Sequence, residues 1–405
     1  MTEATSAASA SPSPFADASW FDPLEEAVRR QVRAFIEELL DEELDAALGR
    51  SRYERHGTAT GHRHGRRSRQ LLTTFGPLEL SVPRARLRDP AGEREWKSTL
   101  LPAYKRLSPR AEALIAQAYL AGMNTRRVRR ALAGLFAGRV SKDAVSRAWQ
   151  WSRSAWEAWQ QRDLASEDIV RLILDGTGVK VRLDRKATAI ALLIALGIRR
   201  DGQKVVLAIK NMGGESEAAW RQLLEDLTAR GLGRPELVIV DGGKGLEAAL
   251  ASLWEEVPVQ RCTVHKERNL LAHAPKHLHE EIKADFDDMV HAESGAEVLA
   301  KRKAFLAKWR LRCREVATSL EEAGERLFTF LRYPPEQWRS LRTTNAIERL
   351  HEEFKRRIKT QCVLPCAETA AMLFWALLAS GQITLRKVDG WQSLAQPPAA
   401  LDLAA

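Results

Sequence analysis

The sequence has little cysteine and no long apolar run. Four cysteines stand unevenly in 405 residues, at Cys262, Cys313, Cys362 and Cys366. So few exclude a disulfide framework and favour a reducing compartment. No apolar stretch approaches the roughly 20 residues that a membrane-spanning helix needs. The opening MTEATSAASASPSPFADAS lacks the basic and apolar regions of a secretory signal. We therefore expect a soluble, cytoplasmic protein without a membrane partner, with residues 1–22 forming a disordered tail.

Acidic residues are outnumbered by basic ones. Lys and Arg total 63 and Asp and Glu total 53, which gives a net charge of +10. A hydrophobic content of 45% and a charged content of 29% are typical of a globular protein, and the length allows two or three domains. The excess of positive charge favours a polyanionic partner, most often nucleic acid, although many basic proteins bind none.

The positive charge is concentrated early in the chain. Nine arginines lie between Arg52 and Arg88, against two acids in the same stretch. Within it, QLLTTF and LELSVPR flank Gly76–Pro77, a pattern that predicts a hairpin of two short strands. Either this stretch is a solvated loop or it is an arm that contacts DNA phosphates. In the second case the contacts are Arg63, Arg66, Arg67 and Arg69.

A helix-turn-helix pattern follows at residues 121–154. Gly138 falls in the predicted turn, Ser141 in the N-cap position, and Val145 and Trp149 on the buried face of the second helix. The residues expected to face a DNA major groove are Lys142, Ser146 and Arg147. Such patterns also arise by chance in helical proteins. We take residues 23–165 as a mainly helical DNA-binding region with a basic hairpin arm.

After residue 166 the pattern changes to that of an α/β protein. Five apolar runs predict strands, and a helix is predicted at 215–230 between the third and the fourth run. The runs cover residues 168–175, 187–200, 204–212, 236–241 and 257–262. Near-continuous apolar strands indicate burial on both faces, and this order of elements predicts a mixed sheet. Residues 266 to about 339 read as helical throughout.

Two of these runs end in an aspartate followed by glycine, at Asp175 and Asp241. If the first and fourth strands are parallel neighbours, the two carboxylates lie side by side at their carboxyl ends. Paired like charges are relieved by a raised pKa or by a bound cation, and oxygen ligands favour Mg²⁺ or Mn²⁺. The alternative is that each aspartate only caps its own turn.

A third acid, Glu348, lies in LRTTNAIERLHEEFKRRIKTQ, residues 341–361. One interpretation is a capping box, with Asn345 as N-cap and Glu348 three residues later. The other is that Glu348 faces the sheet and joins the two aspartates. The same helix carries Lys355, Arg356 and Arg357, which could hold DNA phosphates.

A Cys262-x-x-His265 pair follows the fifth predicted strand. Together with the later His273, His277 and His279 it could form a zinc site. The spacing after His265 matches no standard zinc finger, and a cysteine at a strand end is often only buried. Its role stays open.

The segments LDGTGVKVR, VDGGKGL, VQRCTVHKERNLL and RTTNAIERLHEEFKRRIK resemble, in order and spacing, the bacterial insertion-sequence transposases of the Mutator type. RHG…TTFGPLELSVPRAR extends the resemblance to nearly the whole chain after about residue 25. Cys262 and His265 also match the family, which weakens the zinc hypothesis. The resemblance implies an RNase H-like fold in which Asp175, Asp241 and Glu348 are the DDE ligands of two Mg²⁺ (or Mn²⁺) ions.

The same resemblance implies a layout. The catalytic core would occupy residues 166–265 and 341–390, with an all-helical insertion at 266–340 and a tail at 391–405. Such a protein binds the terminal inverted repeats of its element on double-stranded DNA, as a homodimer or higher oligomer. It then cleaves a strand and transfers it to a target. The alternatives are a catalytically silent DNA-binding regulator and an RNase H-like nuclease that cuts without joining.

Overall fold

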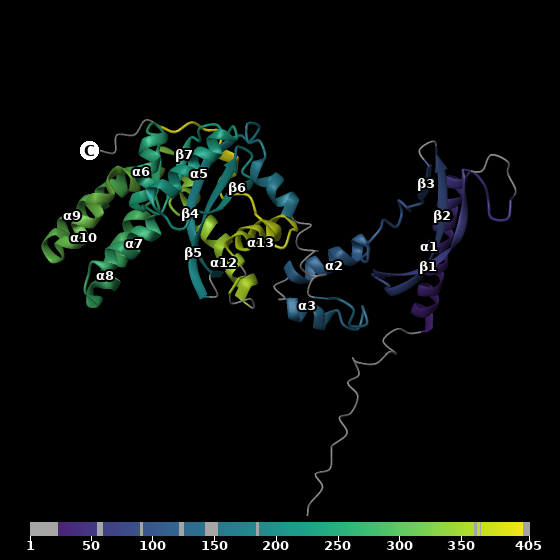
Figure 1. Ribbon diagram of the computed structural model, residues 1–405. Coiled ribbons are helices and arrows are strands. Elements are labelled where there is room, and N and C mark those ends of the chain that lie inside the picture. The colour runs from purple at the N-terminus through teal and green to yellow at the C-terminus, as the bar shows by residue number, and fades with distance from the viewer. Residues whose placement is uncertain are drawn as a thin grey trace, which may run out of the picture. The chain divides into compact units, whose positions relative to one another are not determined.

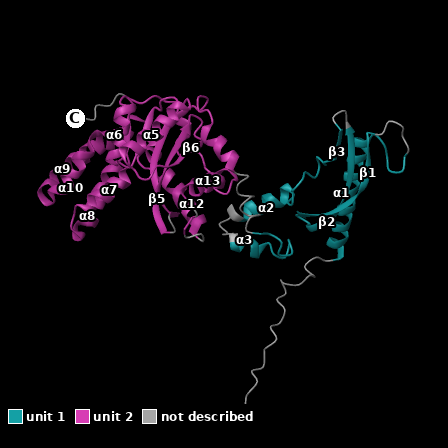
Figure 2. Ribbon diagram, in the orientation of Figure 1, with its two compact units in different colours: residues 1–151 teal, residues 152–405 magenta. Residues whose placement is uncertain are grey.

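The computed structural model describes residues 23–399 except 55–59, 90–91, 121–124, 142–152, 184–185, 360–362 and 365. The chain divides into two compact units, residues 1–151 and residues 152–405 (Figures 1 and 2). The predicted tail at 1–22 lies outside the described residues. Within the described part, every helix is too short or too polar to cross a membrane.

Unit 1 is built on a three-stranded antiparallel sheet in the order β1-β2-β3. Its strands are β1 (Gly61–Thr73), β2 (Gly76–Asp89) and β3 (Gly92–Glu95). The predicted hairpin is confirmed, with Thr73 opposite Gly76, but both strands are much longer than expected. The arginine-rich stretch therefore lies in a strand, and the solvated-loop interpretation is wrong for residues 61–73. Helix α1 (Pro23–Leu48) packs on this sheet through Leu40, which joins Leu80 and Val82 in one apolar cluster.

The remaining described helices of unit 1 are α2 (Pro109–Leu120) and α3 (Thr125–Ala131). Val128 of α3 is fully buried, and Gly138 has a positive φ of 68° in the predicted turn. Lys142, Ser146 and Arg147 lie outside the described residues. The second helix of that motif stays a prediction.

Unit 2 contains a five-stranded mixed sheet in the order β6-β5-β4-β7-β8. The strands are β4 (Ile169–Leu183), β5 (Lys186–Arg199), β6 (Lys204–Asn211), β7 (Leu237–Val240) and β8 (Val259–Arg261). β4 pairs antiparallel with β5 and parallel with β7, and β7 pairs parallel with β8. The predicted mixed α/β sheet, with its first and fourth strands as parallel neighbours, is confirmed.

Helices cover both faces of this sheet. Leu172 and Leu174 of β4 share an apolar cluster with α5 (Glu217–Ala229) and α6 (Lys244–Leu253). Because side chains alternate along a strand, Ile173 and Asp175 point to the opposite face. That face is covered by α12 (Asn345–Ile358) and α13 (Ala367–Ala379), which contact β4.

Between β8 and α12 the chain is entirely helical, as predicted. It forms α7 (Thr263–Ala272), α8 (His279–Val290), α9 (Gly295–Arg312), α10 (Arg314–Ala323) and α11 (Pro335–Leu341), with short 3-10 turns between them. Trp309, Phe286 and Phe305 pack together in its interior.

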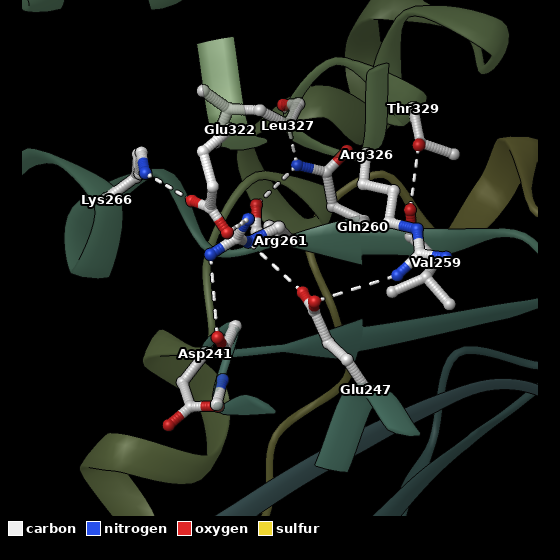
Figure 3. A network of polar contacts seen from close by, with 12 residues as sticks. Asp241, Glu247, Val259, Gln260, Arg261, Lys266, Glu322, Arg326, Leu327 and Thr329 are labelled. Atoms are coloured by element: carbon white, nitrogen blue, oxygen red, sulfur yellow. Dashed lines mark hydrogen bonds and ion pairs between the residues drawn. The ribbon is translucent and has the colours of Figure 1, made fainter. Parts of the chain in front are cut away.

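The helical part is joined to the edge of the sheet by one buried glutamine. Gln260 of β8 donates from Nε2 to the Leu327 carbonyl (2.9 Å) and accepts at Oε1 from the Phe330 N–H (2.7 Å). The Thr329 hydroxyl donates to the Val259 carbonyl at 2.8 Å (Figure 3). The Thr329 bond pairs a backbone carbonyl at the edge of the sheet, and the two Gln260 bonds connect a side chain of β8 to the backbone of the helical part. The helical region is therefore fixed to the sheet next to the strand that ends at Asp241.

Replacing Gln260 should destabilise this junction. We expect Gln260→Leu to lower the free energy of unfolding by about 2–4 kcal/mol, because the Phe330 N–H and Leu327 carbonyl lose their partner while buried. Urea unfolding followed by tryptophan fluorescence measures the loss. Gln222→Leu, on the exposed side of α5, is the control and should change stability by less than about 0.5 kcal/mol. Equal effects of the two substitutions would contradict the role given to Gln260.

Candidate active site

Asp175 and Asp241 lie next to each other because of how β4 pairs with β7. Ile173 is opposite Ile239 in that parallel pair, and each aspartate stands two residues further along its own chain. Both therefore project to the face covered by α12. Asp241 directly follows β7, as predicted. Asp175, however, is not at a strand end, since β4 continues beside β5 as far as Leu183. It stands where the β7 pairing stops, with only 9% of its surface exposed.

Each aspartate also makes one local hydrogen bond. Asp175 Oδ1 accepts from the Gly176 N–H at 2.8 Å, and Asp241 Oδ1 accepts from the Gly243 N–H at 2.9 Å. Turn capping is thus real, but it uses one oxygen of each carboxylate. The second oxygen of each remains for another partner.

A further carboxylate, Glu215, is placed here by the loop before α5. An added Cβ on Gly176 would lie 2.2 Å from Glu215 Oε1, so the absent side chain of Gly176 makes room for this group. Although the residue is exposed overall, burial of its carboxyl group, and then the charges of Asp241 and Asp175, raise its pKa, while His351 lowers it. Sequence reasoning gave Glu215 only as a helix start. The Gly213–Gly214 pair before it was the available signal.

Helix α12 does not begin with the predicted capping box. Its N-cap is Thr344 rather than Asn345, and the Thr344 N–H is directed to Cys262 Sγ at 3.4 Å, not to Glu348. The Thr344 hydroxyl lies 2.8 Å from Glu348 Oε1, and Arg268 Nη2 lies 3.9 Å from Oε2. Glu348 is therefore held by side chains and does not cap its helix.

One turn after Glu348, His351 brings α12 against the first aspartate. Its Nδ1 lies 3.4 Å from Asp175 Oδ2, and the residue is 5% exposed. Its Nε2 has no hydrogen-bond partner among the described residues. The apolar stripe of α12 is buried at Ile347, Leu350 and Phe354, and Ile358 at its end is half-buried. His351 interrupts that stripe and was missed, although its place between Leu350 and Phe354 was the signal.

Cys262 and His265 belong to the same site. Cys262 is the N-cap of α7, and the ligand atoms of Cys262, His265 and Glu348 all lie within 4.8 Å of one another. Among the described residues, none of the three later histidines joins this group; His279 Nε2 instead lies 3.0 Å from the Ala274 carbonyl. The hypothesis of a zinc site that includes His273, His277 and His279 is therefore wrong.

The charges of this group are coupled. The hydrogen bond with Cys262 raises the pKa of His265 to about 9 against the effect of burial, and the charges of Cys262, Glu348 and Asp175 add to the rise. Burial raises the pKa of the Cys262 thiol, whereas its hydrogen bonds with His265 and Thr344 lower that pKa. Together the hydrogen bonds outweigh burial, so the pKa of Cys262 is lowered overall. Glu348 and Asp175 thus both act on one imidazole.

The predicted DNA-binding arginines differ in what they contact. Arg63 pairs with Asp45, and Arg66 pairs with Asp41 at 3.0 Å. Arg69 donates to three backbone carbonyls of residues 101–105, each at 3.0 Å. Arg67 alone of the four is exposed and has no side-chain partner among the described residues. Three of the four are thus committed within unit 1.

On α12, Lys355 and Arg356 are exposed, as predicted for residues that meet DNA. Arg356 also pairs with Glu353 at 2.7 Å. Arg357 donates to the Gln382 carbonyl and lies 3.6 Å from Glu353.

The site could hold a hard divalent cation. Its acids, Asp175, Asp241 and Glu348 with the additional Glu215, offer only oxygen donors, and two of them stand side by side. Carboxylate oxygens are the ligands that Mg²⁺ and Mn²⁺ take. A cation also removes the repulsion between adjacent aspartates. Among the described residues, however, the ligand atoms that lie within 4.8 Å of one another are those of Cys262, His265 and Glu348, and this group does not include the two aspartates.

Comparison with known proteins gives a family. The model of the family described as "Transposase, Mutator family" matches residues 6–384. The transposase for insertion sequence element ISRM5 of Rhizobium meliloti is 33% identical over 350 residues, covering 86% of each chain. That for IS905 of Lactococcus lactis is 31% identical, covering 85% of this chain and 86% of its own. Among solved structures, the Drosophila P element transposase strand transfer complex covers 60% of this chain and 63% of its own, at 14% identity and a TM-score of 0.28, too low to support a common fold.

The raised pKa of His265 gives a test of the site's electrostatics. In metal-free protein, NMR titration should give this imidazole a pKa of about 9. Because the pKa of His265 in the folded protein lies above the ordinary histidine value of about 6.5, the contribution of His265 to stability should be complete below pH 6.5 and lost as the pH rises through about 9. Glu348→Gln removes a nearby negative charge and should lower this pKa.

Glu352→Gln is the matched control, because Glu352 lies on the exposed side of the same helix. It should leave the titration of His265 unchanged. If a folded Glu348→Gln variant also left the pKa of His265 unchanged, Glu348 on α12 would not lie close to His265 on α7.

Proposed function

The chain belongs to the Mutator family of transposases, and we propose that it binds the terminal inverted repeats of its own insertion sequence and catalyses metal-dependent cleavage and transfer of DNA strands. The observation that carries this proposal is the parallel pairing of β4 with β7. It sets Asp175 and Asp241 on the face that α12 covers, and α12 carries Glu348 and touches Asp175 through His351.

The topology supports an RNase H-like core. Three antiparallel strands, β6-β5-β4, are followed by β7 and β8 parallel to β4. Helices lie on both faces, and Asp175 and Asp241 lie just beyond the residues through which β4 and β7 pair. In this proposal the helices of residues 266–340 are an insertion between β8 and α12. The core then resumes at residues 341–390 with the helix that bears Glu348.

Asp175, Asp241 and Glu348 would hold two Mg²⁺ or Mn²⁺ ions. When bound, such ions stabilise charge on the attacking and leaving oxygens of a phosphodiester. The chain's own residues fix the acids. Gly176 and Gly243 bind one oxygen of each aspartate, and His351 lies against the second oxygen of Asp175. Glu215 adds negative charge to the same place.

Glu348 reaches the site on a helix whose start is held by α7. Thr344 contacts both Cys262 and Glu348, so the N-terminus of α12 and the glutamate are fixed together. His265, protonated at neutral pH by virtue of its raised pKa, balances part of the negative charge. Cys262 and His265 would thus position the third carboxylate without contacting the substrate.

DNA would lie along the exposed cations. Lys355 and Arg356 on α12 are placed to meet phosphates near the acids, and Arg357 less so because Gln382 and Glu353 engage it. Lys142, Ser146 and Arg147 remain proposed groove contacts. An insertion sequence has two ends, and a homodimer or higher oligomer on DNA would supply a site for each.

The direct test is Asp175→Asn. The probe is a duplex that carries an inverted repeat taken from the DNA flanking the gene. Cleavage in Mg²⁺ should fall by more than about a hundredfold, since an amide replaces a charged ligand. Binding of the same duplex in EDTA should persist. Asp168→Asn, at an exposed aspartate before β4 that pairs with Arg200, is the matched control and should cut normally.

Retained cleavage by Asp175→Asn would refute the role of Asp175 as a metal ligand. Joined products separate the proposed activity from that of a nuclease. An end duplex with a free 3′-OH, mixed with supercoiled plasmid, should become covalently attached to it. Cutting without any attached product would indicate a nuclease, and binding without cutting a silent regulator.

A further inference from the structure

Unit 1 contains a basic cleft that differs from the predicted row of arginines. It has a volume of about 740 Å³ and lies between β1 and the segment 96–106. Six cations and one acid are among the residues that line it: Arg67, Arg69, Lys97, Lys105, Arg106, Arg139 and Glu95.

The acid does not neutralise these cations. Glu95 is paired with Arg84 at 2.8 Å, and the hydrogen bond and charge of Arg84 are the main reasons that its pKa is lowered; the charge of Arg67 is a smaller cause. Arg67, Lys97 and Arg106 are exposed, and their side chains have no hydrogen bond or ion pair with another described residue. The cleft therefore concentrates positive charge that the described part of the protein leaves unbalanced.

One wall of the cleft is held in place by Arg69, whose guanidinium group is engaged by backbone carbonyls and is not available to a ligand. Arg69 donates to the carbonyls of Leu101, Pro102 and Lys105. The backbone of Leu72 is bonded on both sides of Leu107, accepting from Ser108 and donating to Arg106, each at 2.9 Å. The backbone of this segment is thus held along β1, and Arg106 is among the residues that line the cleft.

At the same opening stands an exposed aromatic residue. Tyr104 is 93% exposed and has a φ of 66°, a left-handed conformation that is uncommon for a tyrosine. Strain of this kind persists where the surroundings fix the backbone, and it gathers at binding sites. Here the bonds from Arg69 fix it. An exposed ring beside several cations is typical of surfaces that contact nucleic acid.

We propose that this cleft binds the phosphate backbone of one strand of the DNA duplex, through Arg67, Lys97, Arg106 and Arg139, with Tyr104 packed on the neighbouring sugar or base. The proposal rests on the proposed function only in taking DNA as the polyanion. It replaces Arg63, Arg66 and Arg69, whose guanidinium groups are engaged within unit 1, as the main backbone contacts. Arg67 is the one residue common to both assignments.

The test is the salt dependence of binding. The full chain, in EDTA, is titrated with a mixed-sequence DNA duplex at several salt concentrations between about 50 and 200 mM. Each phosphate contact contributes about 0.9 to the slope of log K against log salt, or about eightfold in affinity near 0.1 M salt. The triple variant Arg67→Gln, Lys97→Gln, Arg106→Gln should reduce the slope by about 2–3 and weaken binding more than tenfold.

A charge-matched control removes three exposed cations from the helical region of unit 2, by Lys276→Gln, Lys303→Gln and Arg314→Gln. It loses the same net charge and should change the slope by less than about 1. Equal slopes in the two triple variants would overturn the proposal. So would tighter binding of a matched RNA duplex than of the DNA. This experiment measures binding and no cleavage. The proposed DNA contact in the cleft can therefore fail while the proposed catalytic activity stands, and the catalytic activity can fail while the DNA contact stands.

Tyr104→Asn tests the ring separately. Asparagine tolerates a positive φ, so this variant should fold with unchanged or higher stability. It should nevertheless bind the duplex several-fold more weakly, with the salt slope unchanged, because the ring contributes packing and not charge. Unweakened binding by a folded Tyr104→Asn would remove Tyr104 from the proposed contact.

Discussion

The candidate site depends on a very short piece of parallel sheet. Only residues 171–173 of β4 pair with residues 237–239 of β7. That register nevertheless matters, because a shift of one residue between the two strands would turn one of the two aspartates into the apolar layer beneath α5 and α6 and separate the pair. The cost of the arrangement is two carboxylates side by side, one of them buried. The site must therefore carry compensating positive charge, whether from neighbouring side chains or from ions.

The second constraint is the position of α12. Two contacts set it independently: His351 lies against Asp175, and Thr344 against Cys262. The first joins the helix to β4 and the second joins it to α7. Since α7 follows β8 directly, and Gln260 binds β8 to the backbone of Leu327 and Phe330, the start of α12 is connected through α7 to the same edge of the sheet that holds the helical region. Glu348 is thereby linked to an edge of the sheet far from it in sequence.

The sequence could predict those features of the fold and of the site that depend on neighbouring residues in the chain. Apolar runs gave the five strands, and the glycines after Asp175 and Asp241 marked the two acids. The end of β4 was not predictable, because its second half pairs with β5 and with the distant Leu364, and its alternating pattern begins just where the buried run stops. Glu215 and His351 were missed because their roles depend on tertiary neighbours. The capping-box pattern at Asn345 failed because the helix is capped one residue earlier, at Thr344, and the Asn345 N–H that a capping box would use is directed to Thr343 Oγ1.

The number of arginines in a segment does not show how many of them can bind DNA, and unit 1 shows why. Neighbouring arginines on β1 alternate between the two faces of the strand. Some meet the acids of α1, as Arg63 meets Asp45, while Arg67 faces solvent. The guanidinium group of Arg69 donates its hydrogen bonds to backbone carbonyls. Burial, together with the charge of Arg67, lowers the pKa of Arg69. A guanidinium that is saturated by its own protein gains little from a phosphate. The surface that can bind a polyanion is therefore decided by which cations the fold leaves without an acid, and this is a property of packing rather than of composition.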